Sequence, residues 1–365
     1  MKQFLLAIAL VGVALPAHAQ LGGLGGALKK AQASKQAIDD MNITDAEERQ
    51  IGDDVSAKIR DRFGVVQDPA IHRYVTLIGT TLAKQSERPD LNWTFIVLDT
   101  DGVNAFASPG GLVHVTRGAL ALAKNEAEVA AVLGHEIGHV AHKHTVNAIK
   151  KGKAVQLGSG AAASRSNFLA NYANRAYEMV LENNFDRGDE LDADKVGVTL
   201  SQKAGYNAAG LGAFLARIAE RNKDTAEKNG MFASHPETTE RIAKIKQMAG
   251  SANAAVLVEA RFKEHVRYPP VDLAKIATVV DGAAGLTGSS KEPEPEKKEE
   301  PKKRGFGLGG LKQTVAPEKQ SAQVSASGGA RGLGADRAAK GGPNKALVKV
   351  TVTNADVEAF KKGIA

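Results

Sequence analysis

The sequence predicts an α+β protein, with a mostly helical domain, a small antiparallel sheet and a disordered C-terminal linker. Three observations lead to this expectation. Apolar residues recur at helical spacing over most of residues 41–281. Three short runs rich in β-forming residues lie close together between residues 93 and 116. After residue 281 the chain becomes rich in charge, proline and glycine, a composition that cannot bury a core.

Capping residues and apolar periods place the helices. Thr44 and Glu47 form a capping box at the start of a helix that contains Phe63. Asn125, with Glu128 three residues later, begins a long helix. The other helical periods cover residues 69–85, 168–204, 208–222 and 237–249, and residues 168–204 are predicted as one long helical stretch.

Three strands are predicted at residues 93–98, 103–107 and 112–116. The last two are joined by a Ser-Pro-Gly-Gly turn at residues 108–111, which favours a hairpin. We therefore expect these runs to form the small antiparallel sheet.

The two ends of the chain differ from the domain at 41–281. Residues 1–19 have a positive start, an apolar run too short to span a bilayer and a small-residue cleavage site, as a signal peptide does. Residues 20–40 are glycine-rich, and we expect them to be flexible. Residues 282–345 are predicted to be a disordered linker. We expect an exported protein with no integral membrane span.

The last segment, residues 346–365, is predicted to form a short strand and a short helix. Val348, Val350 and Val352 alternate with polar residues, as in a half-buried strand, and Asn354 is placed to cap the helix.

Composition limits the chemistry. The chain has no cysteine, so disulfides, thiolate metal sites and a cysteine nucleophile are excluded, and a metal must be bound by His, Asp or Glu. The net charge of +7 is spread along the chain. We interpret it as surface charge suited to anionic envelope surfaces, and we expect no nucleic-acid partner.

The stretch GHEIGHVAHKH at residues 134–144 carries the decisive motif. In a helix, His135 and His139 project from one face and can ligate one Zn²⁺, while Glu136 can act as general base on a bound water. The flanking residues are apolar, which a solvated helix would not require. Gly134 and Gly138 each cost about 1 kcal/mol in a helix, which predicts a close approach by metal or backbone.

A catalytic zinc needs a third protein ligand, and the downstream helix offers a candidate. Glu190 and Asp194 lie four residues apart on one face, so Glu190 can ligate the metal and Asp194 can orient a ligating histidine. The alternative is an exposed acidic helix, and spacing alone leaves both interpretations open.

Three further histidines are harder to assign. His142 and His144 lie beyond the motif, and His142 is expected to be structural, because one helix cannot direct four successive turns at one ion. His235 stands in a Ser-His-Pro loop. It can face the site, as a catalytic hydrogen-bond donor or as a blocking fourth ligand, or it can be a surface turn residue.

Four blocks in order resemble peptidase family M48, the gluzincins. They are NAFASPGG with VTRG within residues 104–118, GHEIGHV at 134–140, E-x-x-x-D at 190–194 followed by Gly197, and SHPETTERI at 234–242. The resemblance covers roughly residues 40–250 and does not reach the tail beyond residue 281.

The resemblance implies a zincin metalloprotease fold with one Zn²⁺ per chain. It implies that His135, His139 and Glu190 are the ligands, with Glu136 as base. It places Asp194 behind the ligands and His235 near the metal. It also implies a soluble periplasmic protein, and a sheet edge that binds an extended substrate at Asn104, Ala105, Phe106 and Ala107.

We therefore expect a zinc metalloendopeptidase that acts on polypeptides, with unfolded or misassembled envelope proteins as hypothetical substrates and envelope or outer-membrane proteins as partners. Two alternatives stay open. A zinc-binding chaperone or adaptor would hold chains without cutting them, although it would not need Glu136. A structural envelope protein would act through its glycine-rich basic tail, which deletion of residues 282–365 would test.

Overall fold

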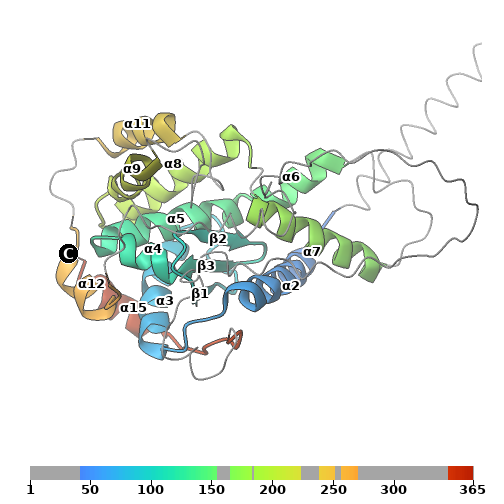
Figure 1. Cartoon of the computed structure of the whole chain (residues 1–365), viewed down its shortest axis with the longest axis horizontal. Coiled ribbons are helices and arrows are strands. Elements are labelled where there is room, and N and C mark those ends of the chain that lie inside the picture. Colours follow the sequence, from blue (N-terminus) through green and yellow to red (C-terminus); the bar gives the residue numbers. More distant parts are fainter. Residues whose placement is uncertain are drawn as a thin grey trace, which may run out of the picture.

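The computed structural model describes residues 42–153, 165–182, 185–222, 238–250, 256–269 and 344–364. The predicted signal peptide, the glycine-rich segment at 20–40 and most of the linker at 282–345 lie outside these residues. Within the described part, helices surround one small sheet (Figure 1). No helix among the described residues is long and apolar enough to cross a membrane.

The sheet has three strands in the order β1-β3-β2, namely β1 (Thr94–Leu98), β3 (Leu112–Thr116) and β2 (Ala105–Ser108). β2 and β3 form the predicted antiparallel hairpin, whose turn contains Gly110 and Gly111 at positive φ. β1 pairs with β3 in parallel, so the expectation of a wholly antiparallel sheet was wrong. The central strand β3 therefore pairs in parallel on one side and antiparallel on the other, and the sheet is mixed.

Helices cover both faces of this sheet, which explains why nearly every strand residue is buried. On one face, alternate residues such as Phe95 and Val113 pack with α3 (Pro69–Ala83) and α5 (Glu126–Ala141). On the other face, Ile96 and Phe106 pack with α2 (Asp45–Phe63) and α7 (Arg165–Glu182). The strands therefore lie between two helical layers.

Local signals set the helix boundaries. The capping box of Thr44 and Glu47 begins α2, and Asn125 accepts a hydrogen bond from the Glu128 amide at the start of α5. The expected single stretch at 168–204 is instead two helices, α7 and α8 (Arg187–Ala204). Asp186 explains the new start, because its side chain caps α8 by accepting from the Asp189 amide.

The remaining helices complete the helical layers. Short helices α4 (Arg117–Leu122) and α6 (His144–Lys153) follow β3 and α5. α9 (Gly210–Asn222) and α11 (Thr238–Ala249) pack beside α8 and α5, and α12 (Glu259–His265) lies near α3 (Figure 1).

Close contact between α5 and α8 depends on glycine. A Cβ atom at Gly134 would lie 3.1 Å from the Gly197 Cα atom, and one at Gly197 would lie 2.9 Å from the backbone nitrogen of His135. A Cβ atom at Gly138 would lie 3.0 Å from the Ala193 Cα atom. The glycines of the motif therefore serve a backbone-to-backbone approach, one of the two reasons expected from the sequence.

The C-terminal segment returns to the domain. Residues 344–353 bind to the domain through scattered hydrogen bonds, such as that from the Val65 amide to the Asn344 carbonyl at 2.6 Å. No strand forms in these residues. The predicted strand was therefore wrong, although Val348, Val350 and Val352 are half-buried as expected. The predicted helix is α15 (Asn354–Lys361), and its N-cap is Thr353 rather than Asn354.

Helix α15 contributes to the main core. Phe360 and Ile364 are buried there, and the guanidinium of Arg261 lies 3.7 Å from the Phe360 ring centroid. Arg261 also pairs with buried Glu126 at the start of α5. The end of the chain is thus connected to the helix that carries the H-E-x-x-H motif.

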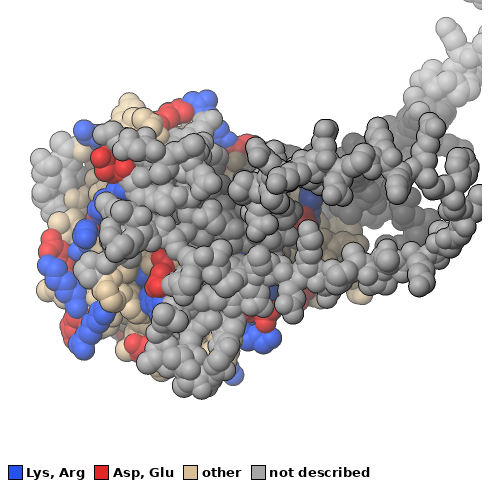
Figure 2. Space-filling model, viewed as in Figure 1, with Lys and Arg blue, Asp and Glu red and all other residues tan. Residues whose placement is uncertain are grey.

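Figure 2 shows basic and acidic side chains side by side over the described part of one face. The described residues on this face therefore carry an interspersed charge.

Candidate metal centre

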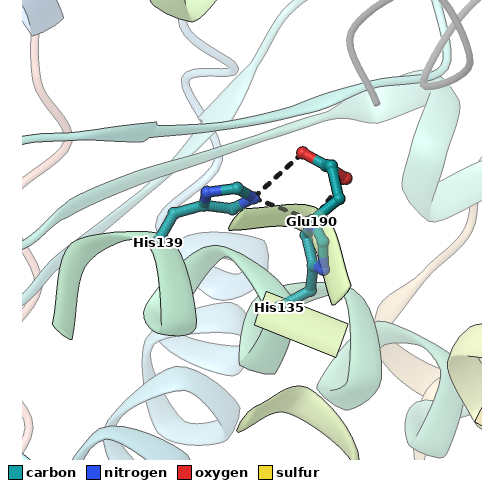
Figure 3. A group of neighbouring side chains, drawn as sticks. All are labelled: His135, His139 and Glu190. Carbon is teal, nitrogen blue, oxygen red and sulfur yellow. Dashed lines mark hydrogen bonds and ion pairs between the residues drawn. The ribbon is translucent and has the colours of Figure 1, made fainter. Parts of the chain in front are cut away.

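Helix α5 presents the two motif histidines toward one point. His135 and His139 are almost fully buried, and their Nε2 atoms lie 3.1 Å apart (Figure 3). The turn of helix between them places both rings on the face that meets α8. Two imidazole nitrogens directed at each other in a buried site need a cation or a proton between them.

Glu190 completes a three-donor cluster from the first turn of α8. Its Oε1 atom lies 3.4 Å from His139 Nε2, and its Oε2 atom lies 3.7 Å from His135 Nε2. Donors around a tetrahedral Zn²⁺ at ordinary bond lengths lie about 3.3 Å from one another. The separations of His139 Nε2 from His135 Nε2, 3.1 Å, and from Glu190 Oε1, 3.4 Å, fit one such ion, and the second carboxylate oxygen lies 3.7 Å from His135 Nε2.

Asp194 lies on the far side of His135, one turn after Glu190. Its Oδ1 atom is 3.0 Å from His135 Nδ1, so a proton on Nδ1 leaves the Nε2 lone pair directed into the cluster. Burial lowers the pKa of His135 to about 3, so the imidazole stays neutral and able to bind a metal.

Arg241 of α11 fixes both carboxylates. It donates to Asp194 through Nε at 2.8 Å and Nη2 at 2.6 Å, and its Nη1 atom lies 2.7 Å from Glu190 Oε2. Burial tends to raise the pKa of Asp194, but hydrogen bonds from Arg241 and His135 outweigh burial and lower it. A buried cation thus keeps Asp194 ionised and holds α8 and α11 together.

Glu136 stands beside the first histidine and is itself buried. Burial raises the pKa of Glu136 to about 7, near the value at which a carboxylate can both accept and release a proton at neutral pH. The site therefore combines a three-donor cluster with a titratable carboxylate.

Two rings border His139. The Nδ1 atom of His144, at the start of α6, lies 3.0 Å from His139 Nδ1. The Phe185 ring lies over His139, with centroids 4.2 Å apart. His142, by contrast, is the C-cap of α5 and contacts Asp192 and Glu87, away from the three-donor cluster.

The expected substrate-binding residues lie at the sheet edge, whereas the expected catalytic His235 is not described. Asn104, Ala105, Phe106 and Ala107 belong to or precede β2, the strand at the sheet edge, and each is at most 5% exposed. His235 lies outside the described residues.

Sequence reasoning missed two contacts of the cluster. Arg241 was noted only as a residue of a helix near His235, yet it contacts both Glu190 and Asp194. His144 was noted only as an extra histidine beyond the motif, yet it contacts His139. A signal was available for each: Arg241 belongs to the block SHPETTERI, and His144 closes the histidine-rich motif.

A helix-borne H-E-x-x-H motif, joined by a glutamate from a second helix beside a small sheet, defines a class of metallopeptidases. Residues 69–249 match the model of peptidase family M48, and this part of the chain belongs to that family.

Relatives of known name agree with this assignment. The chain is 25% identical to the beta-barrel assembly-enhancing protease of Yersinia pestis over 56% of its own length and 44% of the relative. It is 23% identical to the protein of the same name in Escherichia coli (strain K12), over 58% of its own length and 45% of the relative. It is 27% identical to the metalloprotease LoiP of Escherichia coli (strain K12), over 58% of its own length and 84% of the relative. The chain thus spans less than half the length of the beta-barrel assembly-enhancing proteases.

Proposed function

We propose that the protein is a zinc-dependent endopeptidase of the bacterial envelope, exported to the periplasm, that cleaves unfolded or misassembled envelope proteins. The observation that carries the proposal is the convergence of His135, His139 and Glu190 next to the buried carboxylate of Glu136. The class of enzyme follows from family membership, and the metal from the donor set.

Zinc bound by these three residues would supply a positive charge that polarises the scissile carbonyl and acidifies the attacking water. Glu136 accepts the proton of that water and delivers it to the leaving amine. Its raised pKa, about 7, suits both transfers. Asp194 orients His135, and Arg241 keeps the carboxylates of Asp194 and Glu190 in place.

We propose that the substrate adds as an extended strand along the outer edge of β2, at residues 104–107. Main-chain pairing of this kind reads an extended shape more than a sequence, which suits unfolded chains. Because these residues are buried and Phe106 packs with α7, elements that cover β2 must move before a substrate strand can pair there. A requirement for such movement would keep basal activity low.

The envelope setting rests on two supports, the predicted signal peptide at residues 1–19 and the names of the relatives. Proteins whose names refer to β-barrel assembly suggest outer-membrane proteins as substrates or partners for this chain as well.

Digestion of casein by the purified protein, with and without a chelator, tests the proposal. We expect about one zinc per chain, cleavage that the chelator abolishes, and recovery when zinc is restored. The Glu136→Gln variant is the matched control, since it should retain zinc and fold while losing cleavage. Equal cleavage by this variant would remove Glu136 from the mechanism. Zinc binding without cleavage by the wild-type protein would favour a chaperone or adaptor.

A further inference from the structure

A second group of donor side chains lies beside the candidate metal centre. His142, His144 and Asp192 each offer one donor atom within 4.8 Å of the others. The His144 Nε2 atom lies 3.2 Å from Asp192 Oδ2, and the His142 Nδ1 atom contacts the same oxygen. The proposed function does not use this group.

The backbone brings the two histidines to one side. Between them, Lys143 adopts φ of 55°, a left-handed conformation that costs a non-glycine residue roughly 1–2 kcal/mol. Two ion pairs hold Lys143 in place, with Asp45 at 2.8 Å and with buried Glu48 at 3.0 Å. The turn lies between the C-cap of α5, His142, and the first residue of α6, His144, and both rings face Asp192 on α8.

The surroundings suit a divalent cation of the zinc type. Two imidazoles and a carboxylate form a borderline donor set that Zn²⁺ accepts readily. The Oε2 atom of Glu87 lies 3.5 Å from His142 Nε2, where it can orient the ring as carboxylates do behind ligating histidines. Asp189 lies 3.9 Å from His144 Nε2. His142 and Asp192 are 24% and 39% exposed, so solvent reaches the group.

One feature of the surroundings opposes a cation. Lys195 and Lys203 line the same surface pocket as His142 and Asp192. Their positive charge should make this site weaker than the buried cluster of His135, His139 and Glu190.

We propose that His142, His144 and Asp192 form a second, weaker zinc site, and that its occupation opposes metal binding by His139. The first half of this proposal stands by itself, whereas the second half rests on the proposed function.

The coupling follows from proton positions. When His139 binds a metal through Nε2, its proton is on Nδ1, facing His144 Nδ1 at 3.0 Å. That arrangement requires an unprotonated His144 Nδ1, which leaves the His144 proton on Nε2, directed at Asp192. A cation on His144 Nε2 requires the opposite tautomer of His144. Two N–H donors would then face each other, so each metal weakens binding of the other.

Titration of Zn²⁺ into the metal-free full chain, followed by calorimetry, tests the proposal. We expect two classes of site, one zinc binding tightly and a second binding more weakly. His142→Ala and Asp192→Asn should each remove the weak class and keep the tight one. Lys195→Ala should strengthen the weak class, because it removes an opposing charge. Thr199 lines the same pocket without contributing a donor, so the control variant Thr199→Ala should change neither class.

Proteolysis gives the second measurement. Zinc in excess of one equivalent should inhibit the wild-type protein, and His142→Ala, which lacks the weak site, should need at least about tenfold more zinc for equal inhibition. A single class of site in the wild-type protein, or a weak class that persists in both His142→Ala and Asp192→Asn, would overturn the second site. Unchanged zinc affinity of the weak class in Lys195→Ala would also count against the second site, and this variant keeps both histidines in place. Two bound zinc ions without any cleavage would refute the proposed function and leave the second site standing.

Discussion

Replacing Gly197 with alanine should weaken zinc binding more than it weakens the fold. The new Cβ atom would lie 2.9 Å from the backbone nitrogen of His135 and 3.3 Å from the carbonyl oxygen of Ala131. Carbon atoms in ordinary contact lie about 3.5–4.0 Å from their neighbours, so α8 must move away from α5 by roughly half an ångström or more. That movement carries Glu190 and Asp194 away from the two histidines.

The two effects differ in size. Overpacking at a tight interface costs about 1–3 kcal/mol, and alanine returns about 1 kcal/mol of helix propensity. The free energy of unfolding should therefore fall by only about 0–2 kcal/mol. Ligand geometry tolerates about 0.2 Å, so the zinc dissociation constant should rise by about tenfold or more.

Urea unfolding of the metal-free protein and competition with a zinc chelator measure the two quantities separately. Gly212→Ala on α9 is the matched control, because its Cβ atom would meet the Ile245 side chain of α11, with Cγ2 at 3.2 Å, and no atom of α5 or α8 within 4 Å. It should leave zinc affinity unchanged. If Gly197→Ala stabilised the protein by about 1 kcal/mol and kept full zinc affinity, the close approach of α5 and α8 would not position the ligands.

Three further predictions follow from the same structure. Arg241→Met leaves two buried carboxylates without their cation, so it should lower the free energy of unfolding by about 3–5 kcal/mol and weaken zinc binding by about 10–100-fold. Normal zinc affinity of this variant in calorimetry would contradict a role for Arg241 in holding the ligands. Glu136 works as a base only when deprotonated, and burial raises its pKa to about 7, a value that the charge of a bound zinc can only lower. We therefore expect kcat/KM to fall as pH falls through a midpoint at or below about 7. A profile that stays flat from about pH 8 to about pH 5 would exclude this carboxylate as the base. Deletion of residues 344–364 exposes the surface that Phe360 and Ile364 cover, and burying each of these side chains is worth about 1.5–3 kcal/mol. After the ordering cost of the segment is subtracted, the free energy of unfolding measured in urea should fall by about 2–4 kcal/mol. Equal stability of the shortened chain would show that α15 adds nothing to the core.

Much of the helical framework could be predicted because its signals are local. A capping box at Thr44, an N-cap at Asn125 and a turn with two glycines at 110 and 111 each act within a few residues. The two histidines of the motif share a helix, so their spacing alone predicts that they face one point.

The errors concern partners far apart in the chain. The parallel pairing of β1 with β3 joins residues 94 and 112, and nothing in either strand distinguishes it from antiparallel pairing. Arg241 meets Asp194 across 47 positions, so periodicity could not reveal it. Residues 348–352 alternate as a strand does, but Arg73 donates to the Thr351 carbonyl and Gln67 donates to the nearby Ala346 carbonyl. A pattern of burial does not choose between side-chain partners of this kind and a strand ladder.

The return of the C-terminal segment changes what a cut in the chain would do. Tyr268 packs against the main core, and Asn344 bonds to Val65 of the same domain, so residues 270–343 begin and end on one folded body. While the chain is intact, α15 meets its binding surface at a high effective concentration that is independent of dilution. After a cut anywhere in residues 270–343 the same contacts become an association between two molecules, so the C-terminal peptide would stay bound in concentrated samples and leave on dilution.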